Sequence, residues 1–281
     1  MEIRINGKIA DIIIENEKTV GEVMSNLELW LSASGHRLSA VAIDGQTIDI
    51  SSIEEAFSRD ISSIKTLDFC TASITELTLV CLMNLIGDLD EFDSLDFNKR
   101  NEFFLEWLKR PQAVFAGEQM PDLFSAYRLL FENSGVTSDV LRAITEERIN
   151  ETEAPVNEFI AMRTQVEEIC RRLVDLPLDI QTGKDGQAAV TIQLFSAIAE
   201  KTFRLYRQFE IQGYFQPVET LSGIIDDFNV AIKELLQAYE MQDTVLIGDL
   251  AEYEMAPRLL ELYNTIYHFI KEQDVNDDKV V

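Results

Sequence analysis

Residues 1–50 read "MEIRINGKIADIIIENEKTVGEVMSNLELWLSASGHRLSAVAIDGQTIDI", and this stretch decides the fold of the N-terminal part of the 281-residue chain. Ile3 and Ile5 alternate with polar residues, which is typical of a half-buried β-strand. The Asn-Gly pair at 6–7 provides the positive φ angles of a tight hairpin turn. We therefore predict a β-hairpin whose returning strand covers 9–14.

A helix is predicted to follow this hairpin. Thr19 and Glu22 have the spacing of a capping box, in which each side chain satisfies a free backbone N–H of the first turn. Gly35 is expected to end the helix in a left-handed conformation. The apolar residues at helical spacing are predicted to face the sheet as one stripe, and they are Val20, Val23, Leu27, Trp30 and Leu31.

Residues 40–50 predict a second hairpin around an Asp-Gly turn, followed by a short helical turn at 51–57 and a last strand at 64–69. With the motifs "INGK", "TVGEV" and "IDGQTI", this order resembles the β-grasp fold of the ubiquitin-like superfamily over residues 1–72. Tags and sulfur carriers of that superfamily end in a free Gly-Gly, whereas this chain continues through "CTASITEL" and ends in "DDKVV". The resemblance therefore implies a docking module, which offers a sheet face or an edge strand to a partner.

Residues 73–281 are predicted to form an all-α helical-bundle domain, because apolar residues recur at helical spacing and no β-like alternation appears. The fold class is thus α+β, a β-grasp module followed by helices. The segment "GDLDEFDSLDF" (87–97) is predicted to interrupt the first helix as an acidic connector, and 273–281 to be a disordered tail.

The charge of the chain restricts its partners. The formal net charge is −26, of which residues 1–70 carry −6 and the remainder −20. Such a field repels nucleic-acid backbones and anionic membranes, so neither is expected as a partner. A basic protein partner would be attracted by this charge, and the simpler explanation is that the charge serves solubility alone. The longest apolar run (77–86) is too short to span a bilayer, and the N-terminus lacks the pattern of a secretory signal. We expect a cytoplasmic protein.

Motifs for catalysis, cofactors and metals are lacking. The chain has two histidines, His36 and His268, outside the spacings of zinc-protease or di-iron sites, and it contains no P-loop, GxGxxG or GxSxG. Cys70, Cys81 and Cys170 form no CxxC pair or disulfide framework. We predict no catalytic residue, no cofactor and no metal.

The acidic segment 87–97 fails as a calcium site. Phe92 stands where an EF-hand loop requires a ligand, and Lys99 stands where it requires a bidentate Glu. The segment is predicted to be either a solvated loop or a docking patch for a basic partner. The candidate docking residues are Asp88, Asp90, Glu91, Phe92, Asp93 and Asp96.

A second interaction surface is predicted in residues 217–240, where apolar residues alternate at spacings of three and four, as in helices that cross at a shallow angle. The stripe is covered either by the following helix, which we favour because the connector is short, or by a second copy in a homodimer. Pro257 is expected to kink or end that following helix near Met255. The stripe consists of Val218, Leu221, Ile225, Phe228, Ile232, Leu235 and Tyr239.

Two functions are consistent with these patterns. The favoured hypothesis is a non-enzymatic adaptor, chaperone-like protein or assembly factor that binds another protein. The alternative is an enzyme with a carboxylate-lined cleft that uses a divalent metal. Buried acids converging in one cleft favour the enzyme, and exposed aromatic patches favour the binding protein.

Overall fold

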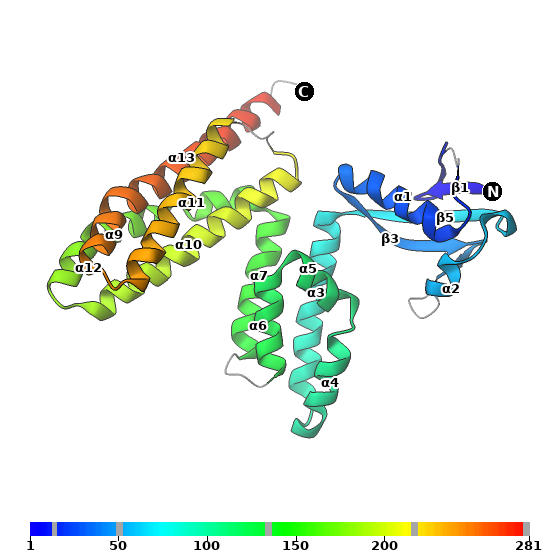
Figure 1. Cartoon of the computed structure of the whole chain (residues 1–281), viewed down its shortest axis with the longest axis horizontal. Helices are drawn as coiled ribbons and strands as arrows, with labels where there is room; N and C mark the ends of the chain where they lie inside the picture. Colours follow the sequence, from blue (N-terminus) through cyan, green and yellow to red (C-terminus); the bar gives the residue numbers. More distant parts are fainter. Residues whose placement is uncertain (13–15, 49–52, 133–136, 215–218, 278–281) are drawn as a thin grey trace. The chain divides into compact units, whose positions relative to one another are not determined.

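The computed structural model describes residues 1–12, 16–48, 53–132, 137–214 and 219–277 (Figure 1). The chain divides into two compact units, residues 1–145 and 146–281. An N-terminal mixed sheet is followed by a mostly helical region, so the predicted fold class is confirmed. The expected domain boundary after residue 72 lies inside the first unit, and independent folding of 1–72 stays a prediction.

The sheet has five strands in the order β2-β1-β5-β3-β4. β1 and β5 run parallel, and the other neighbouring pairs are antiparallel. The first and last strands of the sheet are therefore direct neighbours (Figure 1). The strands are β1 (Glu2–Ile5), β2 (Lys8–Ile9), β3 (His36–Ile43), β4 (Gln46–Thr47) and β5 (Thr66–Ser73).

Both predicted hairpin turns are confirmed. The φ angles are 49° at Asn6 and 75° at Gly7, and 51° at Asp44 and 82° at Gly45. These paired positive values are those of the turn that matches the twist of two antiparallel strands. Asn6 also holds the turn against β5, because its Oδ1 accepts a hydrogen bond from the Thr71 N–H at 2.9 Å.

Two strands differ in length from the prediction. The returning strand of the first hairpin was predicted to reach residue 14, but β2 ends at Ile9, and 13–15 lie outside the described residues. The last strand continues past the predicted residue 69 to Ser73 because β3 pairs with β5 up to that residue.

Helix α1 (Val20–Ala33) covers one face of the sheet. It begins at the predicted capping box, in which Thr19 Oγ1 accepts from the Glu22 N–H at 3.3 Å and Glu22 Oε2 accepts from the Thr19 N–H at 3.1 Å. Gly35, with a φ of 71°, follows its end as predicted. The short α2 (Ile53–Phe57) and η2 (Ile61–Ser63) complete the connection to β5. The buried residues of this part are Ile3, Val20, Val23, Leu27, Leu31, Val41, Ile43, Ala56, Ile64, Leu67 and Phe69.

Trp30 departs from the predicted stripe of α1. Its exposed fraction is 64%, whereas Val20, Val23, Leu27 and Leu31 are buried. Those four residues already complete a stripe at spacings of three and four. Trp30 precedes Leu31 and lies roughly 100° around the helix from it. The prediction that Trp30 faces the sheet is therefore wrong.

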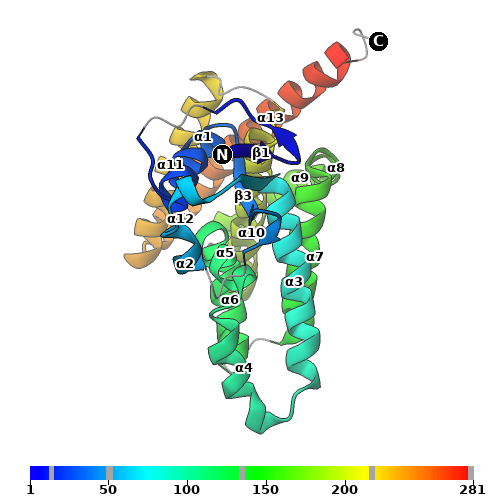
Figure 2. The same cartoon turned by 90° about the vertical axis from the view of Figure 1, so that its right-hand side faces the viewer.

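Helix α3 (Ile74–Ser94) corrects the predicted acidic connector. It begins at the second capping box, where Ser73 Oγ accepts from the Glu76 N–H at 3.1 Å. The expected interruption at 87–97 is wrong, because the helix continues to Ser94. The physical reason is that Leu89 and Phe92 extend the buried stripe of the helix. Figure 2 shows the chain turning at the end of α3 into α4.

Short helices complete the first unit. Pro111 and Pro121 occupy the first turns of α5 and α6, where their missing N–H costs nothing. Trp107 lies in the core of these helices, stacked on Phe124 with ring centroids 5.5 Å apart. The elements are η3 (Phe97–Lys99), α4 (Arg100–Trp107), α5 (Pro111–Gln119), α6 (Pro121–Phe131) and α7 (Ser138–Glu153), the last of which ends in the second unit.

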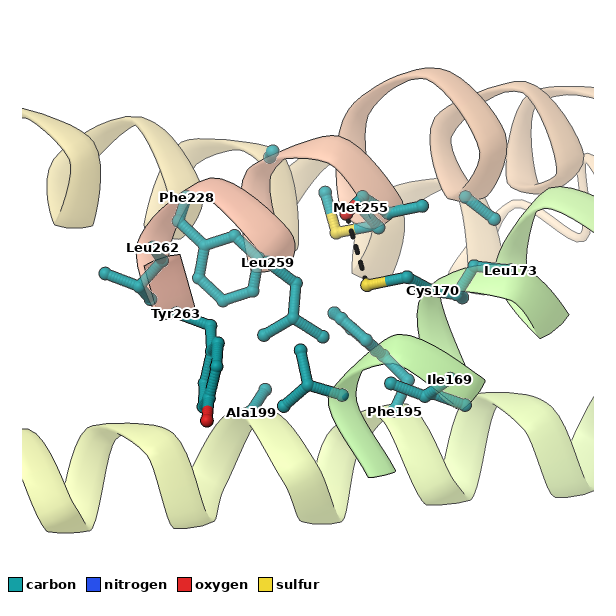
Figure 3. Packing of buried hydrophobic residues seen from close by; sticks show 14 of the residues in the cluster. Ile169, Cys170, Leu173, Phe195, Ala199, Phe228, Met255, Leu259, Leu262 and Tyr263 are labelled. Carbon is teal, nitrogen blue, oxygen red and sulfur yellow. Dashed lines mark hydrogen bonds between the residues drawn. The ribbon is translucent and has the colours of Figure 1, made fainter. Parts of the chain in front are cut away.

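The second unit is helical, with one apolar core drawn in Figure 3. Met162 separates α8 (Pro155–Ala161) from α9 (Arg163–Gln181), and a loop at 182–184, in which Gly183 has a φ of 72°, separates α9 from α10 (Asp185–Ile211). The elements are α8 (Pro155–Ala161), α9 (Arg163–Gln181), α10 (Asp185–Ile211), α11 (Glu219–Glu240), α12 (Thr244–Leu250), the π-helical turn η4 (Ala251–Met255) and α13 (Ala256–Asp277).

The predicted stripe of 217–240 lies on α11. Leu221, Phe228 and Leu235 are buried in the same core as residues of α13. Tyr239 is exposed, and Val218 lies outside the described residues. The inner part of the stripe is thus covered within the chain, and the homodimer alternative stays a prediction.

The kink predicted near Met255 corresponds to η4, which ends at that residue. Pro257 has no N–H to donate to the carbonyl four residues earlier, and a π-helical turn is one way in which a helix absorbs such an irregularity. Cys170 Sγ of α9 donates to the Ala256 carbonyl at 3.4 Å (Figure 3).

The predicted disordered tail is partly wrong, since 273–277 belong to α13, while 278–281 lie outside the described residues.

Among the described residues, no helix has both the length and the apolar character that crossing a bilayer requires.

Candidate docking groove

A groove of about 490 Å³ lies between the first hairpin and α1. The two arms of the hairpin stay paired just beyond β2, because the Ala10 N–H donates to the Ile3 carbonyl of β1 at 2.9 Å. Because β2 is an edge strand, the groove lies at the border of the sheet. The lining residues are Ile5, Ala10, Asp11, Ile12, Glu17, Val23, Asn26, Leu27 and Trp30.

The floor of the groove is apolar. Val23 and Leu27 belong to the buried stripe of α1, and Ile5 and Ala10 are half-buried against them. Ile12, by contrast, is exposed at the rim. A polar ligand would lose water here and find few hydrogen-bond partners, so the floor is suited to apolar side chains.

The polar side of the groove is formed by Asp11, Glu17 and Asn26. Glu17 Oε1 accepts from Asn26 Nδ2 at 2.6 Å, which connects the segment before α1 to the helix itself. Within the described part of the lining, both ionisable residues are carboxylates, and Glu17 is held in position by the α1 side chain of Asn26.

Trp30 is the functional candidate that the sequence interpretation missed. Large aromatic side chains exposed beside an apolar depression are typical of binding surfaces, where Trp is among the most frequent energetic anchors. One signal was present in the sequence: the stripe Val20, Val23, Leu27 and Leu31 is complete without Trp30. Leu29, its neighbour, is also exposed but does not line the groove.

Two of the predicted docking residues in α3 are buried and cannot meet a partner. Asp88 is only 3% exposed and accepts hydrogen bonds from Trp107 Nε1 at 2.9 Å and from Arg110 Nη1 at 2.6 Å. Gln112 Nε2 adds two contacts at 3.0 Å. Phe92 is buried in an aromatic cluster, 4.7 Å from the Phe131 ring centroid. Their interpretation as an exposed patch is wrong because partners distant in the sequence cover them.

Three of the exposed acids bind other side chains of the same unit. Asp90 forms an ion pair with Arg142 at 2.6 Å, and Asp93 Oδ1 accepts from Ser138 Oγ at 2.5 Å. Glu91 accepts from Arg110, and this hydrogen bond lowers the pKa of Glu91. Docking through these acids or through the exposed Asp96 stays a prediction.

The second unit has its own cluster of three carboxylates, which two cations bind. Glu151, 2% exposed, accepts from Arg204 at 2.7 and 2.9 Å. Lys201 Nζ donates to Glu147 at 2.8 Å and to Glu158 at 2.9 Å. Buried carboxylates that are paired in this way are typical of a structural network.

No group of three or more His, Cys, Asp or Glu able to hold a metal ion occurs in the ranges that the structure describes. The two buried thiols are poor nucleophiles. Burial raises the pKa of Cys81 to about 12, with a contribution from the Asp88 charge, and burial raises the pKa of Cys170 to about 11. A thiol with such a pKa stays protonated at neutral pH.

Comparisons with known proteins match two separate regions of the chain. Residues 1–73 match the family described as the TP0873 N-terminal domain, and this match ends at the last residue of β5. Residues 159–265 match a domain of unknown function, DUF8042, which covers α9 to α12 and parts of α8 and α13. A protein of Treponema pallidum (strain Nichols) with the name "Uncharacterized protein" is 20% identical over 272 residues, 95% of this chain and 97% of the relative. No solved structure shows a significant match.

Proposed function

We propose that this protein is a non-enzymatic, cytoplasmic adaptor, chaperone-like protein or assembly factor that binds another protein, and that its sheet is a β-grasp domain of the ubiquitin-like kind. The strand order β2-β1-β5-β3-β4, the parallel pair β1–β5 and the covering helix α1 support the fold part of the proposal. A fold alone does not define a function, so the function rests on the groove.

The observation that carries the proposal is the exposure of Trp30 at the rim of an apolar groove. Exposed aromatic surface is costly in water, and its burial against a partner recovers roughly 25 cal/mol for each Å². The floor formed by Val23 and Leu27 gives such a partner an apolar pocket beside the indole ring.

The alternative of an enzyme with a carboxylate-lined cleft receives less support. The buried acids Asp88 and Glu151 are bound by Arg110 and Arg204, respectively. Neither acid lines the groove. A catalytic acid or base has to reach a substrate, and these two carboxylates are engaged in ion pairs inside the fold.

Site-specific photo-crosslinking tests the proposed function. A photoreactive phenylalanine at position 30 is expected to give one dominant covalent adduct with a cytoplasmic protein of the native host. The same residue at position 29 is the control, because Leu29 is exposed on α1 but does not line the groove.

The crosslinked protein is then purified and titrated with the full chain. We expect a stoichiometric complex that Trp30→Ala weakens at least tenfold. Equal adducts at positions 29 and 30, or a complex indifferent to Trp30→Ala, would contradict the proposal.

A further inference from the structure

We infer that the groove binds a segment of a partner protein in which apolar side chains lie next to Lys or Arg. This inference rests on the proposed function and names the chemistry of the partner. It follows from two properties of the lining, which are its apolar floor and the sign of its charges.

The floor determines the apolar part of the segment. Val23 and Leu27 are at most 6% exposed, while Ile12 is 38% and Trp30 64% exposed. Water covers the apolar floor and the exposed aromatic rim of the empty groove. Binding is favourable when apolar side chains of a partner replace this water. The volume of about 490 Å³ lies within the range of roughly 300–1,000 Å³ that is common for binding sites.

The charges determine the flanking residues of the segment. Among the described residues that line the groove, the ionisable ones are Asp11 and Glu17, and both are carboxylates. A cation of the partner that approaches this side of the groove meets the carboxylates of Asp11 and Glu17.

The charge of the whole chain has the same sign as the groove. The formal net charge is −26, and residues 1–70 carry −6 of it. Complementary fields of this kind accelerate association with a positively charged partner and slow association with an acidic one. An acidic apolar segment would be repelled at long range and again inside the groove.

Peptide selection on the full chain tests the inference. A phage-displayed library of random peptides is selected on the wild-type protein, with the Trp30→Ala variant as the counter-selection. We expect the enriched peptides to combine aliphatic or aromatic residues with Lys or Arg. Enrichment of acidic or uncharged peptides, or no enrichment that depends on Trp30, would overturn the inference.

Tryptophan fluorescence then measures the affinity of an enriched peptide. The chain has two tryptophans. Trp107 is fully buried and Trp30 is exposed, so a shift of the emission to shorter wavelength on binding reports on Trp30. Trp30→Phe, which leaves Trp107 alone, is expected to abolish the shift.

A matched pair of charge variants tests the role of the carboxylates. The double variant Asp11→Asn, Glu17→Gln is expected to weaken binding roughly threefold to tenfold at low salt. The difference should shrink at about 1 M salt, where charges are screened beyond roughly 3 Å. The control Glu54→Gln, Glu55→Gln removes the same charge from exposed positions of α2 outside the groove, and it should change the affinity less than twofold.

The results separate the chemistry of the partner from the existence of the site. If both double variants have the same effect while Trp30→Ala abolishes binding, the groove is a docking site but the inference on basic residues is wrong. If the crosslinking experiment at position 30 also fails, the proposed function is wrong as well. Thermal melting of each variant confirms that it is folded.

Discussion

Gly248 of α12 lies so close to Pro177 of α9 that a side chain on Gly248 would fit only if Pro177 moved by a few tenths of an ångström. A Cβ atom on Gly248 would be 3.2 Å from the Pro177 Cβ and 3.3 Å from its Cα. Pro177 stands inside α9, where it cannot donate a hydrogen bond to the carbonyl of Leu173. Pro177, which interrupts the hydrogen bonds of α9, therefore packs against Gly248 of α12, which has no side chain.

Gly248→Ala is expected to destabilise the protein by about 1–3 kcal/mol, the typical cost of overpacking a core. In an open helix the same change would stabilise by up to about 1 kcal/mol, because Ala has the higher helix propensity. The control is Gly87→Ala in α3, where no atom lies within 4 Å of the new Cβ. Urea denaturation of both variants measures the two effects, and equal signs would contradict the close contact.

Asp88→Ala is expected to cost about 1–3 kcal/mol of unfolding free energy, since Arg110 keeps Glu91 but loses its buried partner, and buried donors are left without an acceptor. The Trp107 N–H also loses its acceptor. Asp90→Ala removes an acid of the same helix whose ion pair with Arg142 is more exposed, and its expected cost is about 0–1 kcal/mol. Chemical denaturation measures both values. A cost for Asp88→Ala no larger than that for Asp90→Ala would contradict the buried network.

Phe228→Ala is expected to cost about 3–5 kcal/mol, because the ring is fully buried in the core of the second unit. Tyr239→Ala, at the exposed end of the same stripe, should change stability by at most about 0.5 kcal/mol. Light scattering of the wild type and both variants is expected to give the mass of one chain. A wild-type mass of two chains that Phe228→Ala halves would instead assign the stripe to a dimer.

Acid is expected to weaken the N-terminal sheet through Asp44. Its carboxylate accepts from the N–H groups of Thr66 and Lys65, and these bonds lower its pKa below the ordinary value of about 3.9. The stabilising contribution is therefore fully present above that pH and is lost as the pH falls through the lowered pKa. Asp44→Asn should make the loss of stability below about pH 4 less steep, as measured by urea denaturation at several pH values. An unchanged slope would contradict this role.

The sequence was most informative where structure depends on neighbouring residues. The two turns, the capping box of α1 and the position of Gly35 all follow from a few consecutive residues, and all are confirmed. Such features depend on backbone conformation and local hydrogen bonds, which a single sequence specifies.

Asp88 and Trp30 were both misassigned, for different physical reasons. The burial of Asp88 depends on groups that are distant in the sequence, whereas the exposure of Trp30 depends on neighbours in its own helix. Asp88 is polar but buried, because its carboxylate accepts hydrogen bonds from Trp107, Arg110 and Gln112, which are distant in the sequence. Trp30 is apolar but exposed, because other side chains already fill the face of α1 that meets the sheet. The composition and the apolar periodicity of the sequence do not show which distant residues will cover Asp88.

The parallel pairing of β1 with β5 has a consequence for synthesis on the ribosome. Glu2–Ile5 leaves the exit tunnel first, yet its neighbour in the sheet, Thr66–Ser73, is translated last of the five strands. Closing so long a loop is slow compared with forming a hairpin or a helix. The first hairpin and α1 therefore emerge before β5 can join β1 to β3, and the apolar residues of α1 remain accessible to chaperones until Ser73 has been released.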